Sequence, residues 1–264
     1  MKMTVALITG ATGGLGRALA HEHAKRGGDL ILVGRNQMKL ASLKAQLHVA
    51  YPLVLIETIQ ADFAKGGQVQ QVFDAVQTLG WQVDYLINNA GFGGQGKFIS
   101  REKEADLTML RVNAAVPTAF MKLFLPLMVK QGYGHVLNVS SAAAFFPGPE
   151  MAEYYATKAY LTSLGNAIWQ EMKATRVTVT TLMPGPMETG FATAGDLTTT
   201  KLFKPGTGAD PALIAKVGYE GMLAGKLNVV AGLPSWAKVS AKLYPLLPKR
   251  LVLKVIENLQ TKKK

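Results

Sequence analysis

Apolar positions along the chain fall into two alternating kinds of segment. Short runs rich in Val, Ile and Leu predict buried strands at residues 5–8, 30–33, 54–56, 85–87, 135–137, 177–179 and 227–230. Longer segments with helical patterning lie between them, at residues 15–26, 37–50, 68–79, 105–130, 155–174 and 211–224. Alternation of this kind predicts an α/β fold with one doubly wound parallel sheet of about seven strands and helices on both faces.

The chain shows no sign of division into domains. No linker rich in Pro, Gly or Ser interrupts residues 1–264, so we expect a single dinucleotide-binding and catalytic domain. In a doubly wound sheet the ligand lies outside the carboxyl ends of the strands. The loops that follow the predicted strands should therefore carry the function.

A glycine-rich loop follows the first predicted strand and leads directly into a helix. It contains Gly10, Thr12, Gly13, Gly14, Leu15 and Gly16. Glycines at such a turn allow the backbone to approach a pyrophosphate, which then lies over the positive end of the helix dipole. The loop predicts a Rossmann-type nucleotide site, and the alternative is a turn that is glycine-rich without a ligand.

The end of the second predicted strand indicates which nicotinamide nucleotide binds. NAD-binding proteins place an acid there to bind the ribose hydroxyls, but this chain has Gly34 and Arg35. A guanidinium attracts and can bind a 2′-phosphate with two hydrogen bonds. We therefore expect NADP(H), with NAD(H) second; the alternative is that Arg35 is a solvated charge.

A tyrosine and a lysine with helical spacing provide candidate acid–base chemistry. Tyr154 and Lys158 are four residues apart on a predicted helix and so share a face, where an ammonium favours the phenolate. Tyr155 is three residues from the same lysine, so spacing alone leaves it as a second candidate for the acid–base tyrosine.

The motifs together resemble those of the short-chain dehydrogenase/reductase family, whose glycine signature is TGxxxGxG. Asn88-Asn89-Ala90-Gly91 follows the fourth predicted strand, Tyr154 to Lys158 opens a helix, and Pro184 to Thr189 follows the sixth strand, all in the family's order. The resemblance covers about residues 4 to 190. The position in the family motif selects Tyr154 over Tyr155.

The resemblance implies roles for further residues. It implies that Asp62 accepts a hydrogen bond from adenine, that Asn89, Ala90 and Gly91 build the nucleotide cleft, and that Thr189 binds the nicotinamide carboxamide. Asp62 and Asn89 have an alternative as turn residues.

The resemblance also completes a catalytic group of four. It implies that Ser141 binds the reacting oxygen, that Asn113 holds a water of the proton relay, and that Lys158 also binds the nicotinamide ribose. Tyr154 is then the general acid or base in the interconversion of a carbonyl and an alcohol. No metal is expected, and His21 and His23, on the first predicted helix, are expected to be exposed.

Two segments and one loop are candidates for substrate contact. Residues 190–208, rich in Thr, Gly and Ala, predict a mobile substrate lid, and residues 91–96 are either the opposite rim or a flexible connection. Residues 235–264 form a basic amphipathic extension in which two short helices fit. These helices either pack on the lid or a second subunit, or lie on an anionic membrane surface to meet a lipid-like substrate.

The composition and charge of the chain exclude some classes of function. The chain has no cysteine, which excludes disulfides and a cysteine nucleophile and is compatible with the cytoplasm, where we expect the protein to be located. Its net charge is +12, but no nucleic-acid recognition motif accompanies the lysines. No apolar run reaches the length of a spanning helix. We expect a small-molecule carbonyl or alcohol substrate and, from the resemblance, a homodimer or homotetramer; a non-catalytic NADP(H)-binding sensor or scaffold is the alternative function.

Overall fold

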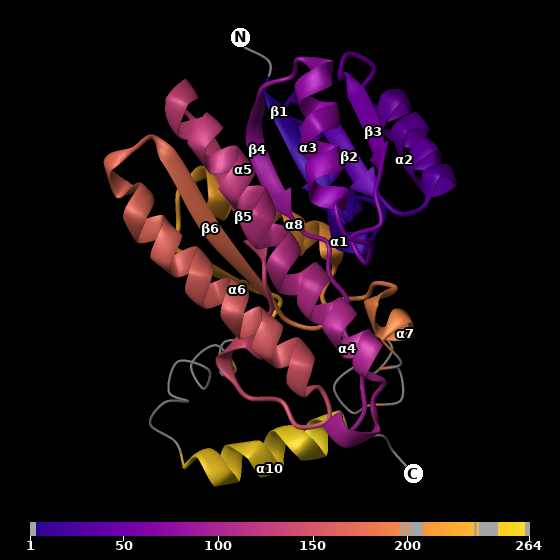
Figure 1. Cartoon of the computed structure of the whole chain (residues 1–264), viewed down its shortest axis with the longest axis vertical. Coiled ribbons are helices and arrows are strands. Elements are labelled where there is room, and N and C mark those ends of the chain that lie inside the picture. The colour runs from indigo at the N-terminus through magenta and orange to yellow at the C-terminus, as the bar shows by residue number, and fades with distance from the viewer. Residues whose placement is uncertain are drawn as a thin grey trace.

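One parallel sheet of seven strands organises the chain (Figure 1). The computed structural model describes residues 4–195, 197, 200, 208–234, 237 and 248–261. The strand order is β3-β2-β1-β4-β5-β6-β7, so the direction of winding reverses between β1 and β4. The strands are β1 Val5–Thr9, β2 Asp29–Gly34, β3 Ile56–Gln60, β4 Val83–Asn88, β5 Gly134–Val139, β6 Val177–Pro184 and β7 Asn228–Ala231. The predicted fold class is confirmed.

Six of the strands overlap the predicted runs, whereas the third was misplaced. The run at residues 54–56 shares only Ile56 with β3, which extends to Gln60. β3 is an edge strand, and Glu57, Thr58 and Gln60 give it polar positions that a search for apolar runs overlooks.

Helices cover both faces of the sheet. One apolar layer joins the sheet to α1 (Gly14–Ala24), α2 (Gln37–Ala50) and α8 (Pro211–Leu223). The other joins it to α3 (Gln68–Leu79), α5 (Val116–Gln131) and α6 (Ala152–Glu171), which lie in front of the sheet in Figure 1. The carboxyl ends of the strands point toward α4 (Lys103–Leu110), α7 (Phe191–Ala194) and α10 (Lys249–Gln260) at the lower end of that view.

The helix predicted at residues 105–130 is interrupted. It consists of α4, a π-helical turn at Arg111–Ala115 and α5. The whole segment Lys103–Gln131 is long and apolar enough to cross a membrane, contrary to the expectation from the sequence. However, 56% of its most apolar window is buried in this fold, as in the core helices of soluble proteins.

The prediction that both histidines of the first helix are exposed was wrong for His23. Its side chain is buried, and Nδ1 lies 2.6 Å from the Tyr219 hydroxyl. Nε2 lies 3.1 Å from the carbonyl oxygen of Thr4. A carbonyl only accepts, so Nε2 carries the proton and Nδ1 accepts from Tyr219.

Parts of the two predicted substrate segments lie outside the described residues. In the expected lid at 190–208 these are residues 196, 198, 199 and 201–207, with Leu202 and Phe203 among them. In the extension at 235–264 the structure describes Ala237 and residues 248–261, so the second of the two expected helices is α10 and the first falls outside the description.

Candidate functional site

The glycine loop closes tightly between β1 and α1. Gly10 has a φ of +63°, which favours glycine, and its carbonyl oxygen accepts a hydrogen bond from the amide of Gly13. A Cβ on Gly16 would lie 2.3 Å from that same oxygen. Two of the four predicted glycines, Gly10 and Gly16, are thus required by the turn itself.

The amino end of α1 is open to an anion. Gly13 is the N-cap residue, no side chain caps the helix, and its first turn contains no acid. Free amides together with the helix dipole form an anion site. The loop therefore fits the pyrophosphate of a dinucleotide, which would lie over Gly14 and Leu15.

Thr189 lies directly above this helix end. A Cβ on Gly14 would be 2.6 Å from Cγ2 of Thr189, so the absence of a side chain at Gly14 lets the loop after β6 approach α1. The Thr189 hydroxyl accepts a hydrogen bond from the amide of Phe191 at 3.3 Å, which fixes the start of α7. Gly14 and Thr189, which are 175 positions apart in the sequence, thus meet at one point.

The loops after β1 and β4 are connected through Asn89. Its side-chain amide donates to the carbonyl oxygens of Thr9, at 2.9 Å, and Gly10, at 3.1 Å. The Thr9 hydroxyl accepts from the amides of Asn89 and Ala90, both at 3.0 Å. Asn89 therefore shapes the cleft, and Thr9, which sequence reasoning did not select, is its partner; the threonine of the TGxxxGxG signature was the available signal.

The residues expected around the adenosine lie at the carboxyl ends of β2 and β3. Arg35 is exposed just after Gly34, and its guanidinium has no hydrogen-bond or ion-pair partner among the described residues. Thr12 approaches the same strand end, since a Cβ on Gly34 would be 3.5 Å from its hydroxyl. Asp62 follows β3 and accepts a hydrogen bond from the amide of Ala64 at 3.2 Å, the geometry of a turn residue.

Asn113 sits in the π-helical turn between α4 and α5. Its side chain is buried, with Oδ1 accepting from the amide of Phe92 at 3.1 Å and Nδ2 donating to the carbonyl oxygen of Phe92 at 2.9 Å. Nδ2 also donates to the hydroxyl of Thr157 on α6, at 3.2 Å. Such turns occur frequently at functional sites because they alter the direction of one side chain. Thr157 is a second residue that the sequence reasoning missed.

Tyr154, Ser141 and Lys158 meet at the ends of β5 and α6. Ser141 follows β5 and caps a short 3-10 turn, and its hydroxyl hydrogen-bonds the Tyr154 phenol. The Lys158 ammonium lies 5.8 Å from the centre of the Tyr154 ring and donates to the carbonyl oxygen of Val139 at 2.9 Å. A Cβ on Gly91 would be 3.3 Å from Lys158 Nζ and 3.1 Å from Asn113 Oδ1, so the four side chains surround one corner of the nucleotide cleft.

Burial sets the protonation states of this group. It raises the pKa of Tyr154 to about 12, although the hydrogen bond from Ser141 lowers it, and Tyr154 is therefore a phenol at neutral pH. Burial also lowers the pKa of Lys158 to about 8. A phenol can donate a proton, whereas a phenolate cannot.

Tyr155, the rival on spacing, faces elsewhere. Its hydroxyl accepts a hydrogen bond from Nε2 of Gln260 on α10. Its ring packs under the loop before α6, where a Cβ on Gly148 would lie 2.3 Å from it. Of the two tyrosines, only Tyr154 lies beside both Ser141 and Lys158.

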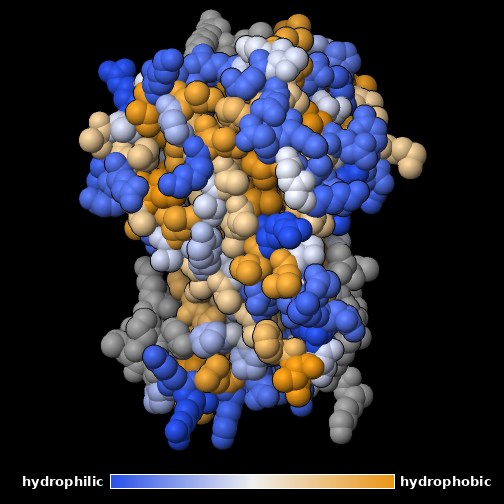
Figure 2. All heavy atoms as spheres, viewed as in Figure 1, coloured by the Kyte–Doolittle hydropathy of each residue, from blue (hydrophilic) through white to orange (hydrophobic). Residues whose placement is uncertain are grey.

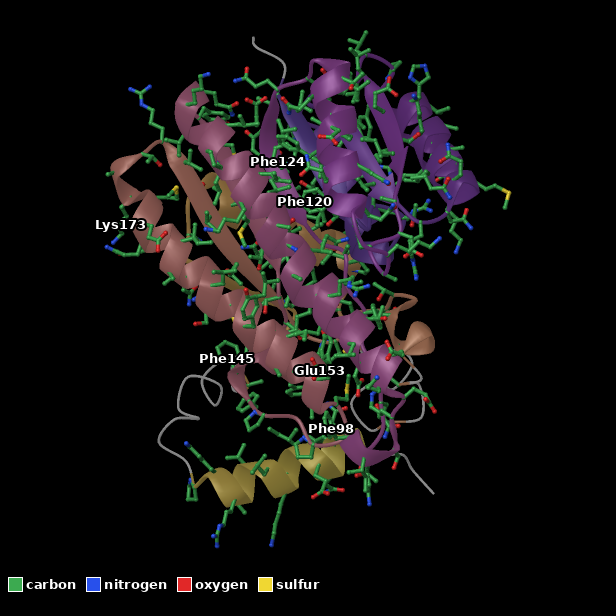
Figure 3. All side chains as sticks on the ribbon, in the orientation of Figure 1. Phe98, Phe120, Phe124, Phe145, Glu153 and Lys173 are labelled. Carbon is green, nitrogen blue, oxygen red and sulfur yellow. The ribbon has the colours of Figure 1, made fainter. Side chains whose placement is uncertain are left out.

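An apolar cluster surrounds the Tyr154 ring. We call it the pocket cluster, and its buried members are Met109, Met151, Tyr154, Tyr155, Leu197 and Ile256. Phe191 on α7 approaches the Tyr154 ring with 5.4 Å between ring centres. Figure 3 shows α10 running beneath the amino end of α6, near the labelled Glu153. Sequence reasoning did not assign Met151 a role, because a single methionine in a loop has no distinguishing pattern.

Metal chemistry has no support in the described part of the chain. Within residues 4–195, 208–234 and 248–261, no three side chains of His, Cys, Asp or Glu are grouped so as to hold a metal ion.

Comparison with known proteins agrees with this geometry. The profile of the family described as short chain dehydrogenase matches residues 4–198. An uncharacterized oxidoreductase of Staphylococcus epidermidis is 30% identical over 196 residues, which cover 74% of this chain and 83% of that protein. A very-long-chain 3-oxoacyl-CoA reductase of Bos taurus is 30% identical over 193 residues, which are 71% of this chain and 60% of the relative.

Solved structures share the fold over nearly the whole chain. A short-chain dehydrogenase from Sphingobium yanoikuyae in complex with NADPH superposes with a TM-score of 0.82 at 24% identity, covering 99% of both chains. A short-chain dehydrogenase/reductase from Burkholderia phymatum in complex with NAD has a TM-score of 0.78 at 24% identity, covering 99% of this chain and 97% of that one.

Proposed function

Because the chain belongs to the short-chain dehydrogenase family, we propose that it is an NADP(H)-dependent oxidoreductase that interconverts a carbonyl and a primary or secondary alcohol. One observation carries the proposal: Tyr154, with Ser141 and Lys158 beside it, lies at the edge of the glycine-loop cleft. A non-catalytic sensor would need the cleft but not this group of three.

NADP(H) is the proposed cofactor because of the end of β2. Arg35 places a free guanidinium where the adenosine ribose would lie, and Gly34 and Asn36 beside it are uncharged. A 2′-phosphate would find a charged donor there, whereas the ribose hydroxyls of NAD(H) would find no carboxylate. The relatives of known structure include complexes with either nucleotide, so the preference rests on Arg35.

The proposed mechanism assigns one task to each side chain. The nicotinamide, when bound, supplies or accepts the hydride. In the reduction, Ser141 donates a hydrogen bond that orients the substrate carbonyl oxygen, and Tyr154 gives its phenolic proton to that oxygen. Lys158 stabilises the resulting phenolate, and Asn113 orients the relay that returns the proton. Oxidation of the alcohol runs through the same steps in reverse.

The substrate is proposed to have an apolar body. The pocket cluster surrounds Tyr154 with methionine, leucine and isoleucine side chains, and such a wall favours an apolar chain or ring system next to the carbonyl. The name of one relative, a very-long-chain 3-oxoacyl-CoA reductase, describes a substrate of this general kind.

A homodimer or homotetramer is proposed through α4 and α5, on which Leu107, Leu110 and Leu127 are exposed.

Replacement of Tyr154 by phenylalanine tests the proposal. Tyr154→Phe keeps the ring in the apolar cluster and removes only the transferable proton, so turnover of NADPH with a panel of ketones and aldehydes should fall at least about a hundredfold. Binding of NADPH, followed by its fluorescence, should stay near the wild-type level. Tyr155→Phe is the matched control and should retain turnover. If Tyr154→Phe remains as active as the wild type, the catalytic assignment is wrong.

A further inference from the structure

Part of the apolar surface of helix α10 is not covered by the rest of the protein. Its inner side contributes Val252 and Ile256 to the pocket cluster, and Gln260 is bonded to Tyr155. Its neighbouring side carries Leu251, Val255 and Leu259, whose side chains are 62%, 53% and 40% exposed. At four-residue spacing these three form one stripe along the helix. Three of the six apolar residues of α10 are therefore exposed.

Basic side chains flank this exposed stripe. Lys249, Arg250 and Lys254 are all exposed on α10, Glu257 is the only acid in the helix, and none of the four has an ion-pair partner among the described residues. Three more lysines, Lys262–Lys264, follow in the sequence. In Figure 3, side chains with nitrogen at their tips project from α10 away from the body of the molecule, and Figure 2 shows hydrophilic and apolar groups side by side at that end.

A second exposed apolar point lies at the same end of the molecule. Phe98, labelled in Figure 3, and the adjacent Ile99 occupy a short 3-10 turn before α4. They are 66% and 92% exposed, and Lys97 precedes them. Large apolar side chains are seldom this exposed together on a soluble surface without a contact to make.

We propose that the exposed stripe of α10, with Phe98 and Ile99, docks the protein on an anionic lipid surface. An amphipathic helix with this pattern lies in the interface, with its apolar residues among the lipid chains and its lysines and arginines at the headgroups. A second copy of the chain is a poorer partner, because α10 carries three basic residues and one acid, so a two-fold contact would bring together two helices of like net charge. The net charge of +12 favours the lipid surface as well.

Docking through α10 would connect the membrane with the reaction site. The same helix presents Leu251 and Val255 outward and Ile256 inward, toward the cluster that contains Tyr154. An apolar substrate dissolved in the lipid would then be separated from the pocket cluster by the width of α10 alone. This part of the inference rests on the proposed function, whereas the docking itself does not.

Vesicle binding of the full chain, without turnover, tests the docking. The probe is sedimentation with vesicles of phosphatidylcholine alone and of phosphatidylcholine with phosphatidylserine. The wild type should bind the anionic vesicles, and each basic residue at the surface should contribute about fivefold, so Arg250→Glu with Lys254→Glu should weaken binding more than tenfold. Leu251→Glu with Val255→Glu should weaken it at least tenfold by removing apolar burial.

A control variant with the same two acids elsewhere on the surface distinguishes docking through α10 from an effect of net charge. Val49→Glu with Leu53→Glu places the same two acids on side chains that are 85% and 88% exposed near the end of α2, and this variant should bind almost as the wild type does. All variants should keep the wild-type circular dichroism. Absence of wild-type binding to anionic vesicles at low salt, or equal loss in the α2 variant, would overturn the proposal. So would a wild-type dimer that Leu251→Glu with Val255→Glu converts to monomers, because the stripe would then be an interface between copies.

Discussion

Protonation of His23 should make the stability of the protein depend on pH. The imidazole accepts from Tyr219 through Nδ1, donates to Thr4 through Nε2 and lies 5.1 Å from the Tyr85 ring. Burial, followed by the nearby charge of Arg26, lowers its pKa from 6.5 to about 4, while backbone hydrogen bonds oppose the change. A proton on Nδ1 would leave the Tyr219 hydroxyl facing a donor.

The sign and size of the effect follow from that pKa. The folded pKa lies below the unfolded value, so the unfolded chain binds the proton more readily and acid favours unfolding. The contribution is fully present above pH 6.5 and is lost as the pH falls toward about 4. Each pH unit in this interval costs about 1.4 kcal/mol, and the whole interval costs roughly 3 kcal/mol.

Urea unfolding at a series of pH values measures this loss through the fluorescence of the three tryptophans. His23→Gln keeps a donor and an acceptor but does not titrate, so the variant should be less stable than the wild type at neutral pH and should lose less stability on acidification. His48→Gln is the control, since His48 is exposed on α2 and its variant should follow the wild type. Burial also lowers the pKa values of His21 and His135, so the difference between wild type and His23→Gln is the relevant quantity.

Two results would refute the reasoning. The first is a wild type and a His23→Gln variant that lose equal stability between pH 6.5 and about 4. The second is a His23 imidazole that titrates near 6.5 in the folded protein, as nuclear magnetic resonance would record.

Two further substitutions test the nucleotide site. Arg35→Ala should weaken NADPH binding by roughly tenfold to a hundredfold and leave NADH binding almost unchanged, because only the phosphate loses a charged hydrogen bond; equal wild-type affinities for both nucleotides would contradict the assignment. Gly16→Ala should abolish NADPH binding, since its Cβ would be 2.3 Å from the Gly10 carbonyl oxygen and 2.8 Å from Asn89 Nδ2. Gly66→Ala, whose Cβ meets nothing within 4 Å, is the control, and normal binding by Gly16→Ala would show that the loop can relax.

The order of the elements could be read from the sequence because most strands are buried on both faces. β1, β2 and β4 consist entirely of buried residues, and such strands appear as continuous apolar runs. β3 could not be placed in this way, since only one of its five residues is buried at the sheet edge. The cytoplasmic location stays a prediction.

The position of His23 on α1 indicates burial, but its hydrogen-bond partner does not appear in the local sequence pattern. His23 lies four residues after Leu19 and three after Ala20, on the face of α1 that packs against the sheet. A polar residue on an apolar stripe is buried when a partner exists, and that partner, Tyr219, is 196 residues away on α8. No local pattern contains such a contact.

The candidate site, too, contains some features that local sequence patterns predict and others that they do not. The spacing of Tyr154 and Lys158 predicted that they share a face, and the glycine pattern predicted the turn before α1. The π-helical turn that orients Asn113 and the contact of Thr189 with Gly14 depend on packing between distant segments, and neither has a local signal.

Similarity to the family profile gives no information about α10, because this helix lies beyond the matched residues. The family profile ends at residue 198, yet Ile256 and Gln260 come from beyond it and contact the cluster around Tyr154 and the neighbouring Tyr155. If the proposed function holds, the chemistry belongs to the matched segment, whereas part of the wall around Tyr154 comes from outside it. Changes in α10 would then alter which molecule is accepted while leaving the reaction the same.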